Sequence, residues 1–303
     1  MSRALVIGEA LIDIVKRDGQ TIGEHVGGSP LNVAVGLGRL GRGVDFLTHI
    51  GTDDNGQRVT AHLKDSGVTL VSGSSTAART PTATAVLDAT GAATYEFDLD
   101  WQVPSAADVH PPVVAHTGSI AAVLGPGALA TAALLDTYRT DATISFDPNV
   151  RPALITDREQ AIARIERIVE RADVVKASDE DLRWIDPTRT PEQIAAAWQK
   201  MGPKIVAVTR GEHGASAVCA AGVARIEAPL VQVVDTVGAG DAFMTGLLDA
   251  LWSLDLLGGG RRAQLSAISV TMLEDVLRSA ARVSAYVVAR PGAELPRRAD
   301  LNH

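Results

Sequence analysis

Short apolar runs alternate with segments of helical periodicity through the second half of this chain. Runs that predict strands lie at 113–116, 142–146, 174–176 and 205–209. Segments that predict helices lie near 127–138, 157–171 and 191–200. This alternation is typical of βαβ units, in which parallel strands form one sheet that helices cover on both faces. The sequence therefore predicts an α/β fold with a mainly parallel central sheet.

The first hundred residues follow this pattern only in part. They predict strands at 4–7 and 44–50 and helices at 31–40 and 57–66. Residues 11–26 instead alternate around Asp18-Gly19, and residues 82–100 alternate around Gly91, as hairpins do. We expect these two hairpins to form a small sheet that projects from the main body. Since no linker or repeat divides the sequence, we expect a single domain over residues 1–303.

Composition argues against several classes of function. The net charge of −8 opposes binding to nucleic acid, which requires a basic surface to neutralise phosphates. The single cysteine, Cys219, rules out an internal disulfide and a cysteine-based metal cluster. No apolar run reaches the roughly 20 residues of a membrane-spanning helix, and none resembles a signal peptide. We therefore expect a cytoplasmic protein that binds neither nucleic acid nor membrane.

The strongest chemical signal is the string Asp235-Thr-Val-Gly-Ala-Gly-Asp241, which precedes a run of helical period. Small residues at a helix start let the backbone approach a ligand, and the free N–H groups there attract negative charge. The loop 238–240 can thus stabilise a phosphoryl group in transfer, and Asp241 can take the proton of an attacking hydroxyl. The alternative is a buried helix for which Asp241 serves only as the cap.

A second signal is the string Gly27-Gly-Ser-Pro-Leu-Asn-Val-Ala34. Its two glycines let the chain turn against a ligand. Asn32, on the first turn of the following helix, offers both a donor and an acceptor to a hydroxyl. The alternative is an ordinary turn before a helix.

The two strings, in this order and about 200 residues apart, resemble the signatures of the ribokinase-like (PfkB) carbohydrate kinases. The resemblance covers nearly the whole chain and is closest in appearance to the fructokinase branch. It includes the strings Gly51-Thr-Asp-Asp-Asn-Gly56, His116-Thr-Gly-Ser119, Asp147-Pro-Asn-Val-Arg151, Lys176-Ala-Ser-Asp-Glu-Asp181 and Thr209-Arg-Gly-Glu-His-Gly214. It implies a ribokinase-like three-layer α/β/α fold whose two hairpins, at about 11–26 and 82–100, form a β lid. The implied activity is transfer of a phosphoryl group from ATP to an alcohol.

The resemblance also implies roles for individual residues. Asp241 would be the catalytic base, and the anion hole would consist of Gly238, Ala239 and Gly240. Residues that would bind the sugar are Asp13, Gly28, Asn32 and Arg151. Residues that would bind the nucleotide are Thr209, Gly211 and Gly214. For Arg151 an ion pair with Asp147 is an equal alternative, and Arg210 and His213 are either phosphate ligands or solvated loop charges.

The implied cofactors are ATP and Mg²⁺, with K⁺ as a further candidate. The family's Asn-x-x-Glu string, which organises magnesium through water, is replaced here by Ser178 and Asp181. Asp181 would therefore act on the metal only through water. A monovalent cation would be held by backbone carbonyls of Asp235 and Val237, opposite the turn at 290–293.

The end of the second hairpin, Phe97-Asp-Leu-Asp-Trp101, lacks the basic residues that bind acidic sugars in related kinases. This favours a neutral sugar, fructose, over 2-keto-3-deoxygluconate. Ribose and nucleosides are alternative acceptors, and a non-catalytic sugar or nucleotide sensor is the remote alternative. The lid aromatics Phe97 and Trp101 would either touch the sugar or pack within the hairpin. The lid also offers exposed sheet edges through which a homodimer can form.

Overall fold

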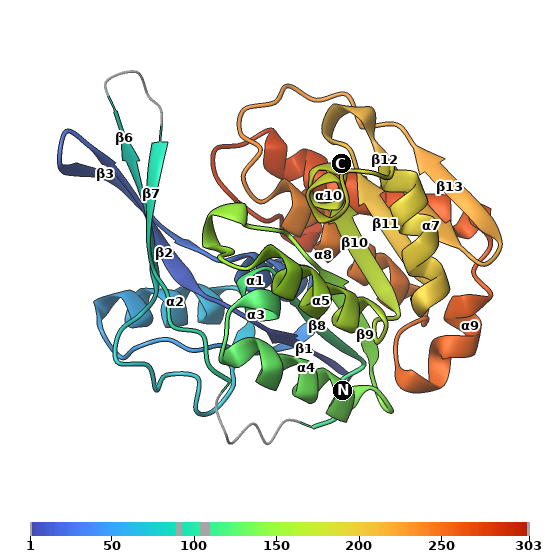
Figure 1. Cartoon of the computed structure of the whole chain (residues 1–303), viewed down its shortest axis with the longest axis horizontal. Coiled ribbons are helices and arrows are strands. Elements are labelled where there is room, and N and C mark those ends of the chain that lie inside the picture. The colour runs from blue at the N-terminus through green and yellow to red at the C-terminus, as the bar shows by residue number, and fades with distance from the viewer. Residues whose placement is uncertain (1, 89–92, 104–109, 302–303) are drawn as a thin grey trace.

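The structure is a computed structural model that describes residues 2–88, 93–103 and 110–301 (Figure 1). A central sheet of nine strands forms its main body, in the order β13-β12-β11-β10-β9-β8-β1-β4-β5. The strands are β1 (Arg3–Ile7), β4 (Gly43–Leu47), β5 (Val68–Leu70), β8 (Val114–Gly118), β9 (Thr143–Asp147), β10 (Val174–Ser178), β11 (Ile205–Thr209), β12 (Ala215–Cys219) and β13 (Gly222–Ile226). Neighbouring strands from β11 to β5 are parallel, and β12 and β13 pair antiparallel at one edge. The predicted mainly parallel sheet is confirmed.

Helices cover both faces of this sheet. One face carries α1 (Ser29–Arg39), α2 (Asp54–Asp65), α8 (Ala239–Ser253), α9 (Arg262–Ser266) and α10 (Val270–Val288). The other carries α3 (Ile120–Val123), α4 (Gly127–Tyr138), α5 (Arg158–Val169), α6 (Asp179–Ile185) and α7 (Pro191–Met201). Each face has its own hydrophobic core, which explains why strands such as β8 and β9 are buried at every position. The result is the predicted three-layer α/β/α arrangement.

The two predicted hairpins form a separate sheet of four strands that extends away from the main body (Figure 1). Its strands are β2 (Leu11–Arg17), β3 (Gln20–Gly27), β6 (Thr82–Leu87) and β7 (Ala93–Asp98), in the order β3-β2-β6-β7. Each hairpin is antiparallel, and the parallel pair β2–β6 joins the two. The turn predicted at Gly91 lies outside the described residues. This sheet is the predicted lid.

Some elements differ from the expected ones. Strands β5, β12 and β13 and helix α10 were not predicted, and the strand expected at 44–50 ends at Leu47. The helix expected at 57–66 begins earlier, at Asp54, because the Asp53 side chain caps it by accepting from the Gly56 N–H at 2.8 Å. Within the described residues, no helix is long and apolar enough to cross a membrane.

Candidate active site

The predicted site residues gather where the parallel strands end. Asp147 is the last residue of β9, Ser178 of β10 and Thr209 of β11, and Glu9 follows β1 by two residues. Helices α1 and α8, which carry the two glycine-rich strings at their N-termini, pack against each other. Ligands of open α/β sheets bind outside the carboxyl ends of the strands, so this edge is the candidate active site.

Asp241 lies in the first turn of α8, and its side chain is buried. Ser29 Oγ donates to its Oδ1 at 2.7 Å, and Asn32 Nδ2 donates to its Oδ2 at 2.8 Å. Both donors come from the first turn of α1. The cap position of α8 is Gly238, with no side-chain hydrogen bond, so the alternative in which Asp241 only caps the helix is wrong.

The surroundings of Asp241 act on its pKa in opposite directions. Burial raises the pKa above the ordinary value for an aspartate. The hydrogen bonds from Asn32 and Ser29, and the charges of Lys176 and Arg151, favour the ionised form and lower it. Burial prevails, so the carboxylate is a stronger proton acceptor than one in water.

The loop before Asp241 requires glycine for two separate reasons. Gly238 has φ of 76°, and a Cβ there would lie 2.5 Å from the Cβ of Ala293. A Cβ on Gly240 would lie 3.1 Å from Lys176 Nζ. The Ala239 N–H donates to the Thr236 carbonyl at 3.2 Å. The N–H groups of Gly240 and Asp241 belong to the first helical turn, whose donors lack intrahelical acceptors, and these can face an anion.

The sugar-binding candidates lie around the base of the lid. Asp13 is on β2 opposite His25 of β3, and a Cβ on Gly27 would meet its Oδ2 at 2.0 Å. Desolvation raises the pKa of Asp13, while His25 and Arg151 lower it. Gly28 has φ of 118°, and a Cβ there would lie 2.5 Å from the Glu9 carbonyl oxygen. Both glycines thus permit close approaches that side chains would block.

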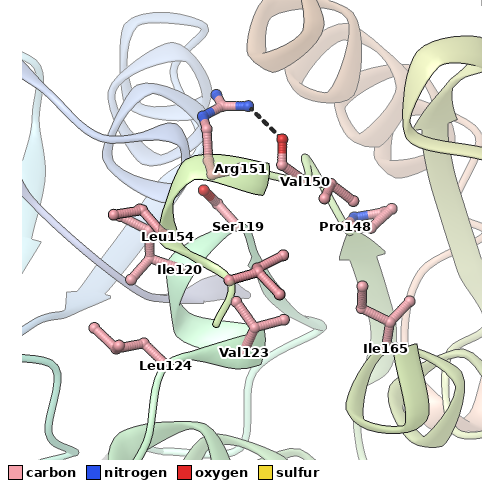
Figure 2. A pocket seen from close by; sticks show the side chains of 10 residues that line it. Ser119, Ile120, Val123, Leu124, Pro148, Val150, Arg151, Leu154 and Ile165 are labelled. Atoms are coloured by element: carbon pink, nitrogen blue, oxygen red, sulfur yellow. Dashed lines mark hydrogen bonds between the residues drawn. The ribbon is translucent and has the colours of Figure 1, made fainter. Parts of the chain in front are cut away.

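Arg151 is exposed beside this edge, and its Nη1 donates to Asn149 Oδ1 at 2.7 Å. Asp147 pairs with Lys176 instead, so the alternative of an ion pair between Asp147 and Arg151 is wrong. Figure 2 shows Arg151 above a pocket whose lining is mostly apolar and includes Ile120 and Ile165. The volume of about 10 Å³ barely admits one water molecule. This pocket is a packing gap next to the site and has no room for a sugar.

The nucleotide-binding candidates lie at the end of β11. Thr209 ends the strand, and Gly211 and Gly214 have φ of 53° and 79° on the turn that follows. Arg210 donates to Glu192 Oε1 at 2.6 Å, and the side chain of His213 is 77% exposed. Arg210 is therefore held in an ion pair with Glu192, and the exposure of His213 favours a solvated loop side chain. Thr209 is in register with Ser178 of β10, the strand that carries Lys176.

The candidate cation ligands differ in their surroundings. Asp181 Oδ1 accepts from the Val150 N–H at 2.7 Å and Oδ2 from the Ser178 N–H at 2.9 Å, so its carboxylate anchors the start of α6. Asp235 accepts from the N–H groups of Val237 and Gly292, at 3.0 and 2.8 Å. The loop 235–238 therefore lies against the turn at 290–293, as predicted. Within the described ranges no three His, Cys, Asp or Glu side chains form a metal site.

Sequence reasoning missed three residues of this site. Ser29 holds Asp241, the carboxylate of Glu9 is buried and accepts from the Ala121 N–H at 3.3 Å, and Lys176 pairs with Asp147. Ser29 and Lys176 stood within strings already singled out, but only the tertiary structure shows what they face. Both lid aromatics pack against the protein: Phe97 stacks on Tyr95, and Trp101 is buried.

Comparison with known proteins agrees with this geometry. The chain matches the family described as "pfkB family carbohydrate kinase" over residues 1–299. A fructokinase from Rhizobium leguminosarum bv. trifolii is 37% identical over 266 residues, which cover 84% of this chain and 81% of that protein.

Two solved structures are similar over almost their full lengths. A fructokinase with bound ATP from Xylella fastidiosa gives a TM-score of 0.84 at 25% identity and covers 99% of this chain and 96% of that one. A double-mutant fructokinase from Vibrio cholerae O395, in its fructose, ADP and potassium ion bound form, gives 0.76 at 28% identity and covers 99% and 97%. The chain belongs to the pfkB family of carbohydrate kinases, which are phosphotransferases with an alcohol as acceptor.

Proposed function

We propose that this chain transfers the γ-phosphoryl group of ATP to a hydroxyl of fructose. The observation that carries the proposal is the pair of hydrogen bonds from Ser29 and Asn32 to Asp241, which fixes a buried carboxylate beside the glycine loop at the start of α8. The solved relatives support ATP and fructose as the two substrates. One is a fructokinase with bound ATP, and another is a fructokinase that holds fructose and ADP.

The transfer step follows from the roles of the chain's own groups. Asp241 takes the proton of the acceptor hydroxyl as its oxygen bonds to the γ-phosphorus, and the bond from that phosphorus to the β–γ bridging oxygen breaks to release ADP. The loop of Gly238, Ala239 and Gly240 stabilises the charge that gathers on the phosphoryl oxygens. No covalent enzyme intermediate is required.

The sugar is held on the lid side of the base. Asp13 accepts hydrogen bonds from hydroxyls, and Gly28 lets the backbone approach the ring. The side-chain oxygen of Asn32 remains an acceptor for the sugar, because the amide nitrogen donates to Asp241. Arg151 is exposed, and within the described part of the chain its guanidinium donates to oxygens of the neighbouring Asn149 and Val150, so it can turn toward the substrate.

Thr209, Gly211 and Gly214 bind the phosphates of ATP in this proposal. A Cβ on Gly214 would lie 2.1 Å from the Ile226 carbonyl oxygen, so the turn keeps its backbone close to the sheet edge. Asp181 would hold Mg²⁺ through water, and the ion would neutralise negative charge on the phosphates. The donor set fits this indirect role, because both Asp181 oxygens already accept backbone N–H groups.

We also propose a potassium site between the loop 235–238 and the turn at 290–293. Backbone carbonyls of Asp235 and Val237 would be the ligands on one side. The hydrogen bond from Gly292 to Asp235 holds the two segments together and supports the proposal.

The proposal is tested by ADP release with a panel of acceptors: fructose, ribose, 2-keto-3-deoxygluconate and a nucleoside. Fructose should give the highest kcat/KM; a preference for another acceptor would reassign the substrate. The carboxylates at the end of the lid repel the acidic keto sugar only in part. Arg79 pairs with Asp98 at 2.8 Å and neutralises it, whereas Asp100 is half exposed and keeps its repulsion. Tight ligand binding without ADP release for any acceptor would instead indicate a sensor.

The catalytic role of Asp241 has its own test. Asp241→Asn should lower kcat by about 10²- to 10⁴-fold, the usual range for a general base, and leave ATP affinity unchanged. Asp275→Asn, at an exposed carboxylate on α10, is the matched control. Near-normal turnover in Asp241→Asn would remove this residue from the mechanism.

We further propose a homodimer in which the lids of two copies pair. Strands β3 and β7 are the outer strands of the lid sheet, and they expose Ile22 and Tyr95. Sedimentation equilibrium should give twice the chain mass, and Ile22→Glu with Tyr95→Glu should give monomers. A monomeric wild-type protein would contradict the proposal.

A further inference from the structure

A buried cation lies directly beneath the anion hole. Lys176 is on β10, its side chain is 2% exposed, and its Nζ lies 3.1 Å from the place a Cβ on Gly240 would occupy. Because Gly240 has no side chain, nothing on that residue separates the ammonium from the backbone of the loop. The sequence motifs gave Lys176 no role, although it begins one of the strings that identified the family.

Asp147 fixes the position of this ammonium. The distance from Lys176 Nζ to Asp147 Oδ2 is 2.5 Å, and Asp147 Oδ1 accepts from the Asn149 N–H at 3.2 Å. The two residues lie on the adjacent strands β9 and β10, and both are buried. Among the described residues, Asp147 is the ion-pair partner of Lys176.

The titratable groups that face Lys176 come from four elements. Asp147 lies on β9, Asp181 on α6 and Asp241 on α8, and all three carboxylates act on its charge. Burial lowers the pKa of Lys176, but these carboxylates outweigh it and raise the pKa, so the ammonium is charged at neutral pH. His116 on β8 is neutral there, because burial and Lys176 lower its pKa to about 3.

Lys176 therefore supplies the positive charge that balances the buried carboxylates of Asp147, Asp181 and Asp241. A buried ion pair contributes little to stability relative to apolar residues of the same size, because desolvating both partners costs about as much as their attraction returns. Packing alone thus gives no reason for an ammonium at this position. Its place beside Gly240 gives one, because negative charge gathers on the phosphoryl oxygens at that loop in the transition state. The same ammonium also favours the ionised form of Asp241 before it takes the proton.

We propose that Lys176 is a positioning residue for phosphoryl transfer, which acts through Asp241 and the loop at Gly240 by holding a fixed positive charge beneath both. This inference rests on the proposed kinase function. Asp147 orients the ammonium and has no contact with substrate in this scheme. Exposed Arg151 supplies charge from the solvent side of the site, and Lys176 supplies it from the sheet side.

The test separates this role from a structural one with a charge-neutral double variant. Lys176→Met alone leaves Asp147 buried without a partner and should unfold more easily. Asp147→Asn combined with Lys176→Met removes both charges and should restore the thermal midpoint. We expect the kcat of the double variant to fall about ten- to a hundredfold, which is at most the effect of removing a direct oxyanion donor. The KM values for ATP and for the sugar should change by less than about twofold.

A second readout is the pH profile of kcat. The acid limb should move to higher pH in the double variant, because Asp241 loses a charge that favours its ionised form. Lys176→Arg, which keeps the charge, should recover part of the lost kcat. The control pair Arg3→Met with Asp45→Asn removes a salt bridge on strands β1 and β4 of the same sheet and should leave kcat and the profile unchanged. Wild-type kcat and pH profile in the Asp147→Asn/Lys176→Met variant would overturn the proposal.

A binding measurement distinguishes failure of this inference from failure of the proposed function. Tetrafluoroaluminate with MgADP mimics the planar phosphoryl group in transfer, and its binding requires no turnover. The wild-type protein should bind MgADP more tightly when tetrafluoroaluminate and sugar are present, and the double variant should lose that gain but keep its affinity for MgADP alone. An equal gain in both proteins would reject the role of Lys176, whatever acceptor the enzyme uses.

Discussion

The side-chain amide of Asn32 donates to the carboxylate of Asp241 across 209 residues of chain, with 2.8 Å between Nδ2 and Oδ2. Ser29, in the same first turn of α1, donates to the other carboxylate oxygen. The helix that carries the sugar-binding string therefore also fixes the catalytic base. Changes in this turn should affect proton transfer and sugar binding to different degrees.

Ser29→Ala should shift the ionisation of Asp241 to higher pH without affecting sugar binding. Loss of a hydrogen bond to a charged group removes about 1.5–3 kcal/mol of stabilisation from ionised Asp241, which raises its pKa by roughly one to two units. The acid limb of kcat should therefore move to higher pH, with KM for fructose unchanged. Steady-state kinetics from pH 5 to 9 measure this. Ser279→Ala, on the exposed face of α10, is the control, and an unmoved acid limb in Ser29→Ala would contradict the prediction.

Asn32→Ala should change both parameters. It loses the same kind of hydrogen bond to Asp241, so the acid limb should again shift, and it also removes the acceptor proposed for a sugar hydroxyl. We expect KM for fructose to rise about tenfold, the equivalent of roughly 1.4 kcal/mol of lost binding. Comparison with Ser29→Ala isolates the second effect. Equal KM values for the two variants would show that Asn32 serves the base alone.

Gly27→Ala should displace Asp13. The new Cβ would lie 2.0 Å from Asp13 Oδ2, so the carboxylate must move away from its present position. KM for the sugar should rise more than tenfold, which corresponds to a loss of more than about 1.4 kcal/mol of binding free energy, while KM for ATP stays constant. Gly23→Ala on the same strand is the matched control, because its Cβ would meet only ordinary contacts of 3.4 Å or more. If the two variants behave alike, Asp13 does not bind the sugar.

Glu9→Gln should stabilise the protein at alkaline pH. Burial raises the pKa of Glu9 from 4.5 to about 7, so the folded state binds the proton more tightly than the unfolded state does. The contribution of protonated Glu9 to the free energy of unfolding is complete below pH 4.5 and is lost as the pH rises through 7. The change amounts to roughly 3 kcal/mol. Glutamine keeps the hydrogen-bond acceptor for Ala121 and cannot ionise.

Urea unfolding of wild type and Glu9→Gln at pH 5, 7 and 9 measures the difference in the free energy of unfolding. It should be small at pH 5 and grow in favour of the variant toward pH 9. Glu212→Gln, at a side chain that is 89% exposed, should show no such trend. A constant difference across this range would mean that Glu9 is ionised in the folded state throughout.

Potassium should increase kcat if the carbonyls of Asp235 and Val237 bind it. Replacement of K⁺ by tetramethylammonium, which is too large for such a site, should lower kcat at constant ionic strength. Asp235→Ala should reduce the response, because the Asp235 carboxylate holds the turn at Gly292 through a 2.8 Å hydrogen bond. Titration of kcat with KCl tests this, and a rate independent of the cation would exclude the site.

The sequence predicted those features that depend on local patterns. The βα alternation, the two hairpins and the glycine loop before Asp241 each follow from periodicity or from residues with special backbone freedom. Helix α10 was missed, although Ser269 caps it and Leu273, Leu277 and Ala280 recur at helical spacing. The antiparallel strands β12 and β13 were missed because their short apolar runs resemble loop segments between helices.

The contacts that define the site could not be predicted in the same way. That Ser29 donates to Asp241, and that Lys176 lies against Gly240, depends on how α1, α8 and β10 pack. Such distances are set by tertiary structure, and nothing in the spacing of these residues along the chain reports them. The resemblance to a family supplied roles for motif residues and left these neighbours unassigned.

The parallel pairing of β2 with β6 makes the lid dependent on the order in which the chain is made. Some sixty residues separate the end of β2 from the start of β6, and they include the lid strand β3 and then α1, β4, α2 and β5 of the main body. During synthesis, β2 and β3 emerge first and expose an unpaired edge until β6 is released. The lid sheet is therefore completed late and through a long-range contact, after α1, β4, α2 and β5 have been made.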